Sequence, residues 1–169
     1  MKTFDSDDVG VVEDVVQVGF SEYVTATEGQ TILAYGLGSC VGVLVRDVDA
    51  GVGGTAVAVL PEAEAGTDSI GAKYADSAAS ELVEAVVDQG ARYEHLEAVI
   101  VGGATIVEFD DLGATVGDEN VAAARTQLGN LGVTVTGSDV GGEQGRVVRF
   151  DTASGAVQVT RADGSTREL

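Results

Sequence analysis

The sequence predicts an α/β (α+β) fold: a single-domain layered sandwich in which a mixed, largely antiparallel sheet is flanked by two main helices. Short runs rich in β-branched residues, separated by glycine and aspartate turn signals, indicate strands. Two stretches with apolar residues at every third and fourth position indicate amphipathic helices. The length of 169 residues suits one well-buried domain. We expect the acidic residues 1–10 to fray and residues 11–169 to form the domain.

The first half of the chain contains strand-like segments in close succession. Residues 15–18 and 23–26 predict a first strand or a hairpin around Gly19. Three further apolar segments follow at residues 31–35, 41–46 and 55–60, and their spacing predicts neighbouring antiparallel strands. Pro61, the only proline, ends the third of these segments.

Two helices and four more strands account for the rest. Residues 74–89 carry an apolar stripe that ends before Gly90, which predicts the first helix. Residues 118–130 form the second, with acidic residues in its first turn and Gly132 beyond its end. The remaining strands are predicted at residues 97–101, 133–136, 146–150 and 156–161.

The charge of the chain restricts its partners. The 28 acidic and 9 basic residues give a formal net charge of -19, and only Lys2 and Lys73 are lysines. Because no basic stripe exists to neutralise phosphates, we expect no nucleic-acid partner. Apolar residues make up 44% of the chain, enough for a folded core rather than disorder. So much like charge is best tolerated where salt screens it, which predicts a halophilic protein from a salt-rich cytoplasm.

The compartment follows from similar arguments. A single cysteine cannot form a disulfide within the chain, in keeping with a reducing environment. The acidic N-terminal stretch does not resemble a signal peptide, and no apolar run approaches the roughly 18 residues of a membrane helix. We therefore expect a cytoplasmic protein without membrane insertion.

The single cysteine is the main candidate for chemistry. Cys40 ends the run Gly36-Leu37-Gly38-Ser39-Cys40, directly after a predicted strand. Glycines allow close backbone approach, so amides of this loop, at Gly38 and Ser39, are candidate oxyanion donors beside a thiol nucleophile. The alternative is that Cys40 is a small apolar core residue, as unpaired cysteines often are.

The only histidine, His95, lies far along the chain. One cysteine and one histidine do not make a usual zinc site, and we expect neither a metal nor a cofactor.

Several further motifs, taken in order, give the chain a resemblance to a known family. They are Gly36-Leu37-Gly38-Ser39-Cys40-Val41, Leu60-Pro61, Lys73-Tyr74-Ala75-Asp76, Gly102-Gly103-Ala104, Gly117 with Asn120, and Asp139, Gly141, Gly142, Gly145 and Arg146. In this order and spacing they resemble the CheD family of chemoreceptor glutamine deamidases, over nearly the whole chain. The resemblance implies a CheD-like fold and the attack of a cysteine on the side-chain amide of a receptor glutamine, through a thioester, to give glutamate.

The resemblance also exposes two departures at the implied catalytic site. Cys40 falls on the nucleophile position. The family's general base, a histidine four positions before the proline, corresponds here to Val57, and a threonine six positions before the cysteine corresponds to Ala34. A histidine both takes the thiol proton and protonates the leaving amide nitrogen, and valine can do neither. Glu62 and Asp76 are conceivable substitute bases, but a carboxylate normally holds no proton to donate at pH 7.

Two functions remain open at this point. The first is a protein-glutamine glutaminase (deamidase), a hydrolase of chemotaxis that acts on methyl-accepting chemoreceptors through Cys40. The second is a possible pseudoenzyme, a binding module for receptors or for the CheC-type phosphatase, which the resemblance implies as a further partner. The preserved cysteine loop favours the first function, and the residues at positions 34 and 57 favour the second.

Overall fold

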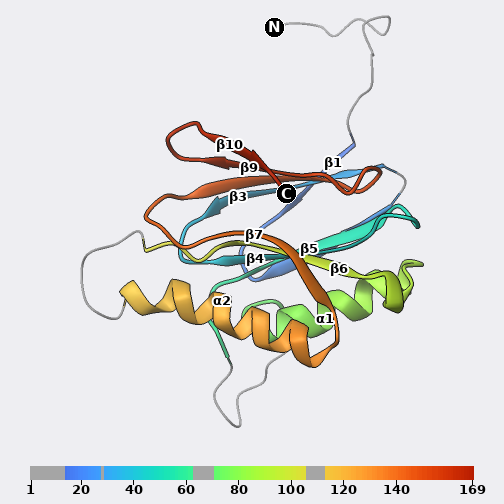
Figure 1. The fold of residues 1–169 in the computed structure, drawn as a ribbon, viewed down its shortest axis with the longest axis horizontal. Coiled ribbons are helices and arrows are strands. Elements are labelled where there is room, and N and C mark those ends of the chain that lie inside the picture. The colour runs from blue at the N-terminus through green and yellow to red at the C-terminus, as the bar shows by residue number, and fades with distance from the viewer. Residues whose placement is uncertain (1–13, 28, 63–70, 106–112) are drawn as a thin grey trace, which may run out of the picture.

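The computed structural model describes residues 14–27, 29–62, 71–105 and 113–169 (Figure 1). Its strands form two five-stranded sheets, a first sheet of order β1-β3-β8-β9-β10 and a second sheet of order β2-β5-β4-β6-β7. In the first sheet the strands are β1 (Val15–Val18), β3 (Thr31–Leu37), β8 (Arg146–Asp151), β9 (Val157–Arg161) and β10 (Thr166–Glu168). In the second sheet they are β2 (Glu22–Ala26), β5 (Val52–Ala58), β4 (Val41–Asp47), β6 (Glu97–Gly102) and β7 (Thr134–Val140).

The two main helices, α1 (Ala75–Asp88) and α2 (Gly113–Asn130), both lie on the second sheet, on the side away from the first (Figure 1). Three layers result, with a core in each of the two spaces between them. One core joins the helices to the second sheet and includes Leu82, Ile100 and Leu128. The other fills the space between the sheets and includes Ile32, Leu44 and Phe150. The predicted α+β layered sandwich with two main helices is confirmed, and the structure adds that its strands form two sheets.

The pairing of the early strands differs from the simplest interpretation of their spacing. β1 pairs in parallel with β3 in the first sheet, whereas β2 pairs antiparallel with β5 in the second, so no hairpin forms around Gly19. β4 and β5 are antiparallel neighbours as predicted, but β3 belongs to the other sheet. The physical reason is that both sheets bury one face in the same core, so a short turn can pass the chain from one sheet to the other.

The helices match their predicted positions with one difference in length. α1 spans Ala75–Asp88, within one residue of the prediction at each end, and buries Ala78, Leu82 and Val86. α2 begins at Gly113, five residues before the predicted start at 118, because the acidic residues taken for its first turn lie inside the helix. No helix in the described part of the chain is long and apolar enough to cross a membrane.

The later strands lie near their predicted positions, with two additions. β7 continues to Val140, beyond the predicted end at 136, and the short strand β10 was not predicted. Residues 1–10, expected to fray, lie outside the described residues.

Candidate active site around Cys40

Cys40 lies where the chain passes from the first sheet to the second. β3 ends at Leu37, and β4 begins at Val41 in the other sheet. Gly36 has φ +67°, a left-handed conformation that favours glycine, at an irregularity in the pairing of β3 with β8. Leu37 is fully buried, whereas Gly38, Ser39 and Cys40 are each partly exposed. The loop is thus anchored in the core by Leu37 and leaves the thiol at the border between core and solvent.

Three consecutive carbonyl groups of this loop accept hydrogen bonds from other segments. The Ala104 N–H donates to the Gly38 oxygen at 2.8 Å and the Gly103 N–H to the Cys40 oxygen at 2.9 Å. Between them, Nδ2 of Asn120 donates to the Ser39 oxygen at 2.9 Å. The C=O and N–H of a trans peptide point in opposite directions, so these bonds turn the N–H groups of Ser39 and Cys40 away from the segments that hold the loop.

The amide of Gly38 differs from those of Ser39 and Cys40 because it is already hydrogen-bonded. The Gly38 N–H donates to the Gly36 oxygen at 2.9 Å, within the loop itself. Of the two predicted oxyanion donors, Ser39 therefore has the better-placed amide, and Cys40 supplies a second N–H beside it. Adjacent backbone N–H groups of this kind form small concave sites for anions.

Glycines at two segments make this close arrangement possible. A Cβ at Gly102 would lie 2.3 Å from the Cys40 oxygen, and a Cβ at Gly117 would lie 2.5 Å from the Gly103 oxygen. Side chains at either position would push the end of β6, the start of α2 and the cysteine loop apart. The glycine motifs at 102–103 and 117 are thus explained by backbone contact around the loop that carries Cys40.

The residues in place of the implied base and its orienting threonine lie in the same core as the thiol. Ala34 and Val57 are each 1% exposed members of the core between the sheets, and Cys40 packs against that core. Val57 pairs with Gly42 across β4 and β5, which places it diagonally from Cys40 on the same face of the sheet. The structure therefore places residues 34, 40 and 57 in or against one core, and two of the three side chains have no polar atom.

This apolar surrounding affects the thiol. Burial raises the pKa of the Cys40 thiol above its usual value, and the backbone N–H of Cys40 only partly offsets that effect. No ionisable side chain among the described residues is hydrogen-bonded or ion-paired with Cys40. Because only the thiolate attacks, most of the thiol is in the unreactive form at neutral pH.

His95 cannot supply the missing base, because it lies at the other end of β4. It ends a short 3₁₀ turn, Tyr93–His95, and its Nδ1 is 3.9 Å from Oδ1 of Asp47 and 3.8 Å from Oδ2 of Asp49. Asp47 is the last residue of β4, whereas Cys40 precedes the first. Seven residues of strand at ~3.3 Å each put about 23 Å between them. The structure therefore excludes His95 as the partner of Cys40.

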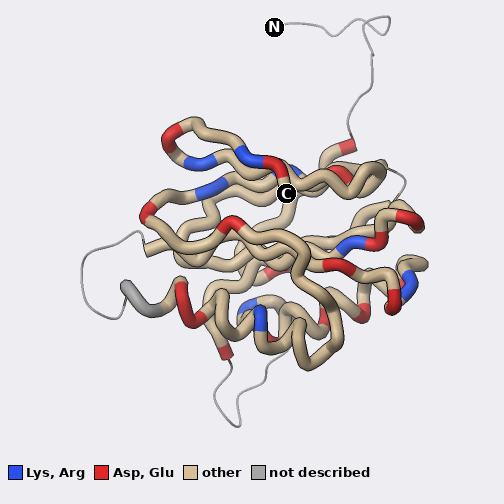
Figure 2. The backbone as a smooth tube through the Cα atoms, viewed as in Figure 1, with Lys and Arg blue, Asp and Glu red and all other residues tan. Residues whose placement is uncertain are grey.

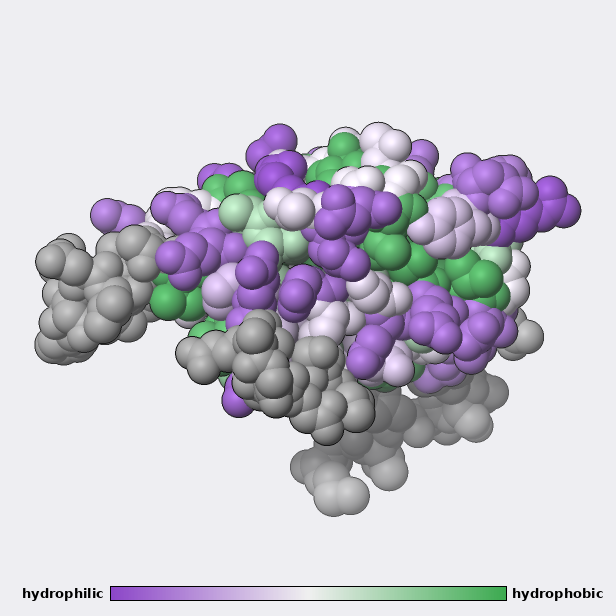
Figure 3. Space-filling model, turned by 90° about the horizontal axis from the view of Figure 1, so that it is seen from below, coloured by the Kyte–Doolittle hydropathy of each residue, from purple (hydrophilic) through white to green (hydrophobic). Residues whose placement is uncertain are grey.

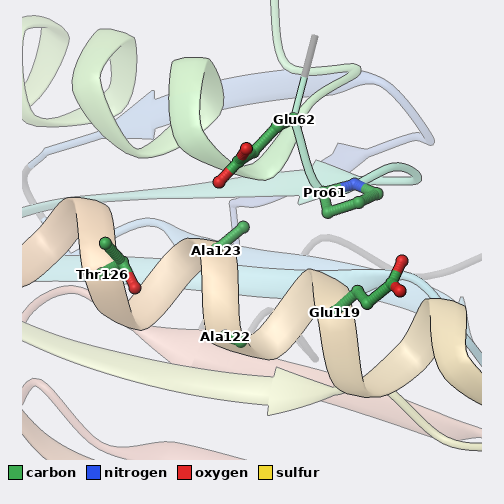
Figure 4. A pocket seen from close by; sticks show the side chains of 6 residues that line it. All are labelled: Pro61, Glu62, Glu119, Ala122, Ala123 and Thr126. Carbon is green, nitrogen blue, oxygen red and sulfur yellow. The ribbon is translucent and has the colours of Figure 1, made fainter. Parts of the chain in front are cut away.

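Neither of the two carboxylates considered as substitutes has a hydrogen bond to the thiol in the described part of the chain. Asp76 is in the first turn of α1, where its Oδ1 accepts the Ser77 N–H at 2.8 Å. Glu62 projects into a surface pocket of about 330 Å³ between the segment after β5 and α2 (Figure 4). The lining of this pocket includes Pro61, Glu119 and Ala123 but no residue of the cysteine loop.

Asn120 is a site residue to which sequence reasoning assigned no role. It is fully buried in α2, and its Nδ2 also donates to the Val59 oxygen, at 3.2 Å, so it joins the cysteine loop to the segment after β5. The signal was its spacing: Asn120, Ala124 and Leu128 recur every fourth residue and are all fully buried. An asparagine on the buried stripe of a helix indicates a polar contact with a specific partner.

The remaining polar motif, Asp139 with Arg146, supports the segment next to the cysteine loop. Oδ1 of buried Asp139, on β7, pairs with Nε of Arg146, on β8, at 2.7 Å, and Arg146 donates to the Gly141 oxygen at 2.8 Å. The Gly141 N–H in turn donates to the Gly102 oxygen at 3.0 Å. This network connects β7, at the edge of the second sheet, to β8, the central strand of the first sheet, and supports the end of β6, which the cysteine loop contacts.

The chain is similar to known proteins over most of its length. Residues 59–161 match the family model described as CheD chemotactic sensory transduction. The chain is 37% identical over 155 residues to a probable chemoreceptor glutamine deamidase CheD of Natronomonas pharaonis, which covers 91% of this chain and 92% of that protein. It is 38% identical over 147 residues to the chemoreceptor glutamine deamidase CheD of Thermotoga maritima, which covers 87% of this chain and 92% of that protein. On these likenesses the chain belongs to the CheD family.

Proposed function

We propose that this chain is a protein-glutamine deamidase of chemotaxis that acts on methyl-accepting chemoreceptors, with Cys40 as its nucleophile. The observation that carries the proposal is the cysteine loop, whose three bonded carbonyl groups direct the N–H groups of Ser39 and Cys40 away from the segments that hold the loop. Relatives named as chemoreceptor glutamine deamidases support the substrate class.

The reaction balances as an acyl transfer to sulfur followed by hydrolysis. The Cys40 thiolate attacks Cδ of the glutamine side chain, and the amide oxygen takes up the negative charge, which the N–H groups of Ser39 and Cys40 stabilise. The C–N bond then breaks, the nitrogen gains the proton that the thiol lost, and ammonia leaves behind a thioester. Water hydrolyses the thioester to glutamate and restores the thiol.

The step that this chain supports least is the proton transfer. With valine at position 57, water must carry the proton from the thiol to the leaving nitrogen. General acid-base help is worth about 10²- to 10⁴-fold, so we expect turnover to be slow by a factor in that range.

An exposed aromatic pair beside the loop supports contact with a protein partner. Phe20 and Tyr35 are 56% and 53% exposed. A Cβ at Gly36 would lie 3.4 Å from Cζ of Phe20, so this ring lies over the start of the cysteine loop. Exposed aromatic side chains next to a reactive residue are suited to hold a protein substrate.

The second candidate function is a binding module for receptors or a CheC-type phosphatase. The apolar side chains at positions 34 and 57 and the raised pKa of Cys40 favour it, because they remove what the chemistry needs but leave the fold and its surface intact.

A mass-spectrometric deamidation assay in high salt, on cytoplasmic receptor fragments, separates the two functions. It compares the wild type, Cys40→Ala, and Val57→His combined with Ala34→Thr. A gain of one mass unit in the wild type that Cys40→Ala abolishes is the result expected of a deamidase. Activity only in the double variant would instead identify a binding module that has lost its base.

A further inference from the structure

Asn120 is placed where a polar side chain is unfavourable unless it has a specific task. It is fully buried, on the same face of α2 as Ala124 and Leu128. Its Nδ2 donates to two carbonyl oxygens, but its Oδ1, also buried, has no hydrogen-bond partner within the described part of the chain. An unsatisfied buried acceptor costs free energy, so stability alone does not explain an asparagine here.

The bond from Asn120 to Ser39 acts on the peptide group next to the thiol. The Ser39 oxygen and the Cys40 N–H belong to one planar trans peptide and point in opposite directions. Holding the oxygen toward α2 therefore directs the Cys40 N–H away from α2. Of the three bonds that hold the loop carbonyl groups, this is the only one that a side chain makes.

The bond to Val59 adds a second constraint. Val59 follows β5, the strand that carries Val57, so Asn120 connects the segment at the nucleophile with the segment at the base position. One amide group thereby adds a bond between the two chain segments, next to the pairing of β4 with β5.

We propose that Asn120 is the positioning residue of Cys40: by holding the Ser39 carbonyl group it aims the Cys40 N–H at the sulfur and at the oxygen of a bound glutamine amide. The oxygen contact rests on the proposed deamidase function, whereas the effect on the thiol does not. The backbone N–H of Cys40 stabilises the thiolate in this structure, as expected of an amide held in that direction.

The test measures the rate of Cys40 alkylation by iodoacetamide against pH. Cys40 is the only cysteine in the chain, so the label reports on one site and requires no turnover. Asn120→Ala is expected to slow alkylation about tenfold below the midpoint and to move the midpoint up by about one pH unit, because the N–H is no longer fixed beside the sulfur. An unchanged pH profile in a folded Asn120→Ala variant would overturn the proposal.

A matched control removes a similar bond elsewhere. Thr152 is 1% exposed, and its Oγ1 donates to the Gln30 oxygen at 2.7 Å. Thr152→Val is expected to lower the melting temperature but to leave the alkylation profile unchanged. If both variants moved the profile equally, the effect would be one of general loosening and the proposal would be wrong.

If Asn120→Ala does not fold, a measurement on the wild type tests the positioning role of Asn120. In NMR spectra the side-chain amide protons of Asn120 are expected to exchange slowly with solvent and to shift in frequency when Cys40 is alkylated. Fast exchange, or no response to alkylation, would contradict the proposal. Deamidation in the receptor assay is scored separately, so a failed deamidase hypothesis would leave this result interpretable.

Discussion

Val57 and Ala34 place apolar side chains in the core against which Cys40 packs. Both are almost fully buried in the core between the sheets, in keeping with apolar residues that pack well there. The thiol beside them is less acidic than usual because burial raises its pKa. A base at position 57 would have the opposite effect, since an adjacent imidazolium favours the thiolate.

Restoring the implied base is therefore expected to lower stability while raising reactivity. Val57→His with Ala34→Thr adds volume and polar atoms to a packed core, which costs about 1–3 kcal/mol of unfolding free energy. The midpoint of Cys40 alkylation should move to lower pH. Urea unfolding and the alkylation profile measure the two effects. Val57→Leu with Ala34→Val adds bulk without a base, so a profile shared by both double variants would contradict the explanation.

Asp139, whose network supports the end of β6, gives the stability of the protein a pH dependence. Burial by itself raises the pKa of this carboxyl group, but hydrogen bonds from Arg161 and Arg146, with the charges of both, lower it below its usual value. A lowered pKa means that the folded state binds the proton less readily than the unfolded state. The stabilisation is therefore complete above the ordinary aspartate pKa and is lost as pH falls below about 4.

Asp139→Asn is expected to lower the free energy of unfolding and to make it less dependent on pH in the acid range. It leaves the buried guanidinium of Arg146 without its charged partner, which costs about 3–5 kcal/mol. Urea unfolding at several pH values between 3 and 7 measures both the lower free energy of unfolding and its weaker decrease toward low pH. The exposed Asp118, on α2, is the control, and Asp118→Asn should change stability by no more than about 0.5 kcal/mol. An acid limb as steep in Asp139→Asn as in the wild type would refute this account.

At the scale of elements, residues 102–104, at the end of β6, fix the cysteine loop by direct backbone contact. Gly102 has φ +109° and leaves no room for a Cβ beside the Cys40 oxygen. Gly102→Ala is expected to cost about 1–3 kcal/mol through backbone strain, with more from the clash, and to disturb alkylation of Cys40. Thermal melts and alkylation rates measure the two effects.

A second glycine, near the C-terminal end of α2, provides the control for Gly102→Ala. Gly129 is exposed in α2, and nothing lies within 4 Å of its Cβ position. Gly129→Ala should therefore stabilise the protein by about 0.5–1 kcal/mol, because alanine is the better helix former. If Gly102→Ala were as well tolerated as Gly129→Ala, the close contact would not be what fixes the loop.

The elements also show what the sequence can and cannot predict. The apolar stripe of α1 identified its helix within one residue, because periodicity directly reports the buried face. Strand segments were found for the same reason, but their partners were not. β1 and β2 are separated by a short turn, yet they lie in different sheets, since pairing depends on distant strands such as β8. The cysteine loop was evident from its motif, whereas the role of Asn120 needed the fold that brings residues 39, 59 and 120 together.

On the whole molecule, the acidic residues are spread over both sheets and both helices, and basic residues are few (Figure 2). The view onto the helix side shows mainly hydrophilic side chains on the surface that the described residues form, with small apolar areas between them (Figure 3). The position of one acidic residue is electrostatically unfavourable. Asp88 is the last residue of α1, and the last turn of this helix has no basic residue. A negative charge at the C-terminal end of a helix opposes the helix dipole.

The net charge of -19 predicts that salt stabilises the protein. The Debye length falls from about 10 Å at 0.1 M to about 3 Å at 1 M, so molar KCl screens repulsion between carboxylates that dilute buffer leaves in force. The melting temperature should rise between the two conditions and should not rise equally in sucrose, which does not screen charge. Asp88→Lys should stabilise the protein in dilute buffer and lose most of that advantage in molar KCl. A melting temperature independent of KCl would show that the surface charge is not an adaptation to salt, because repulsion that screening does not relieve cannot be what limits stability.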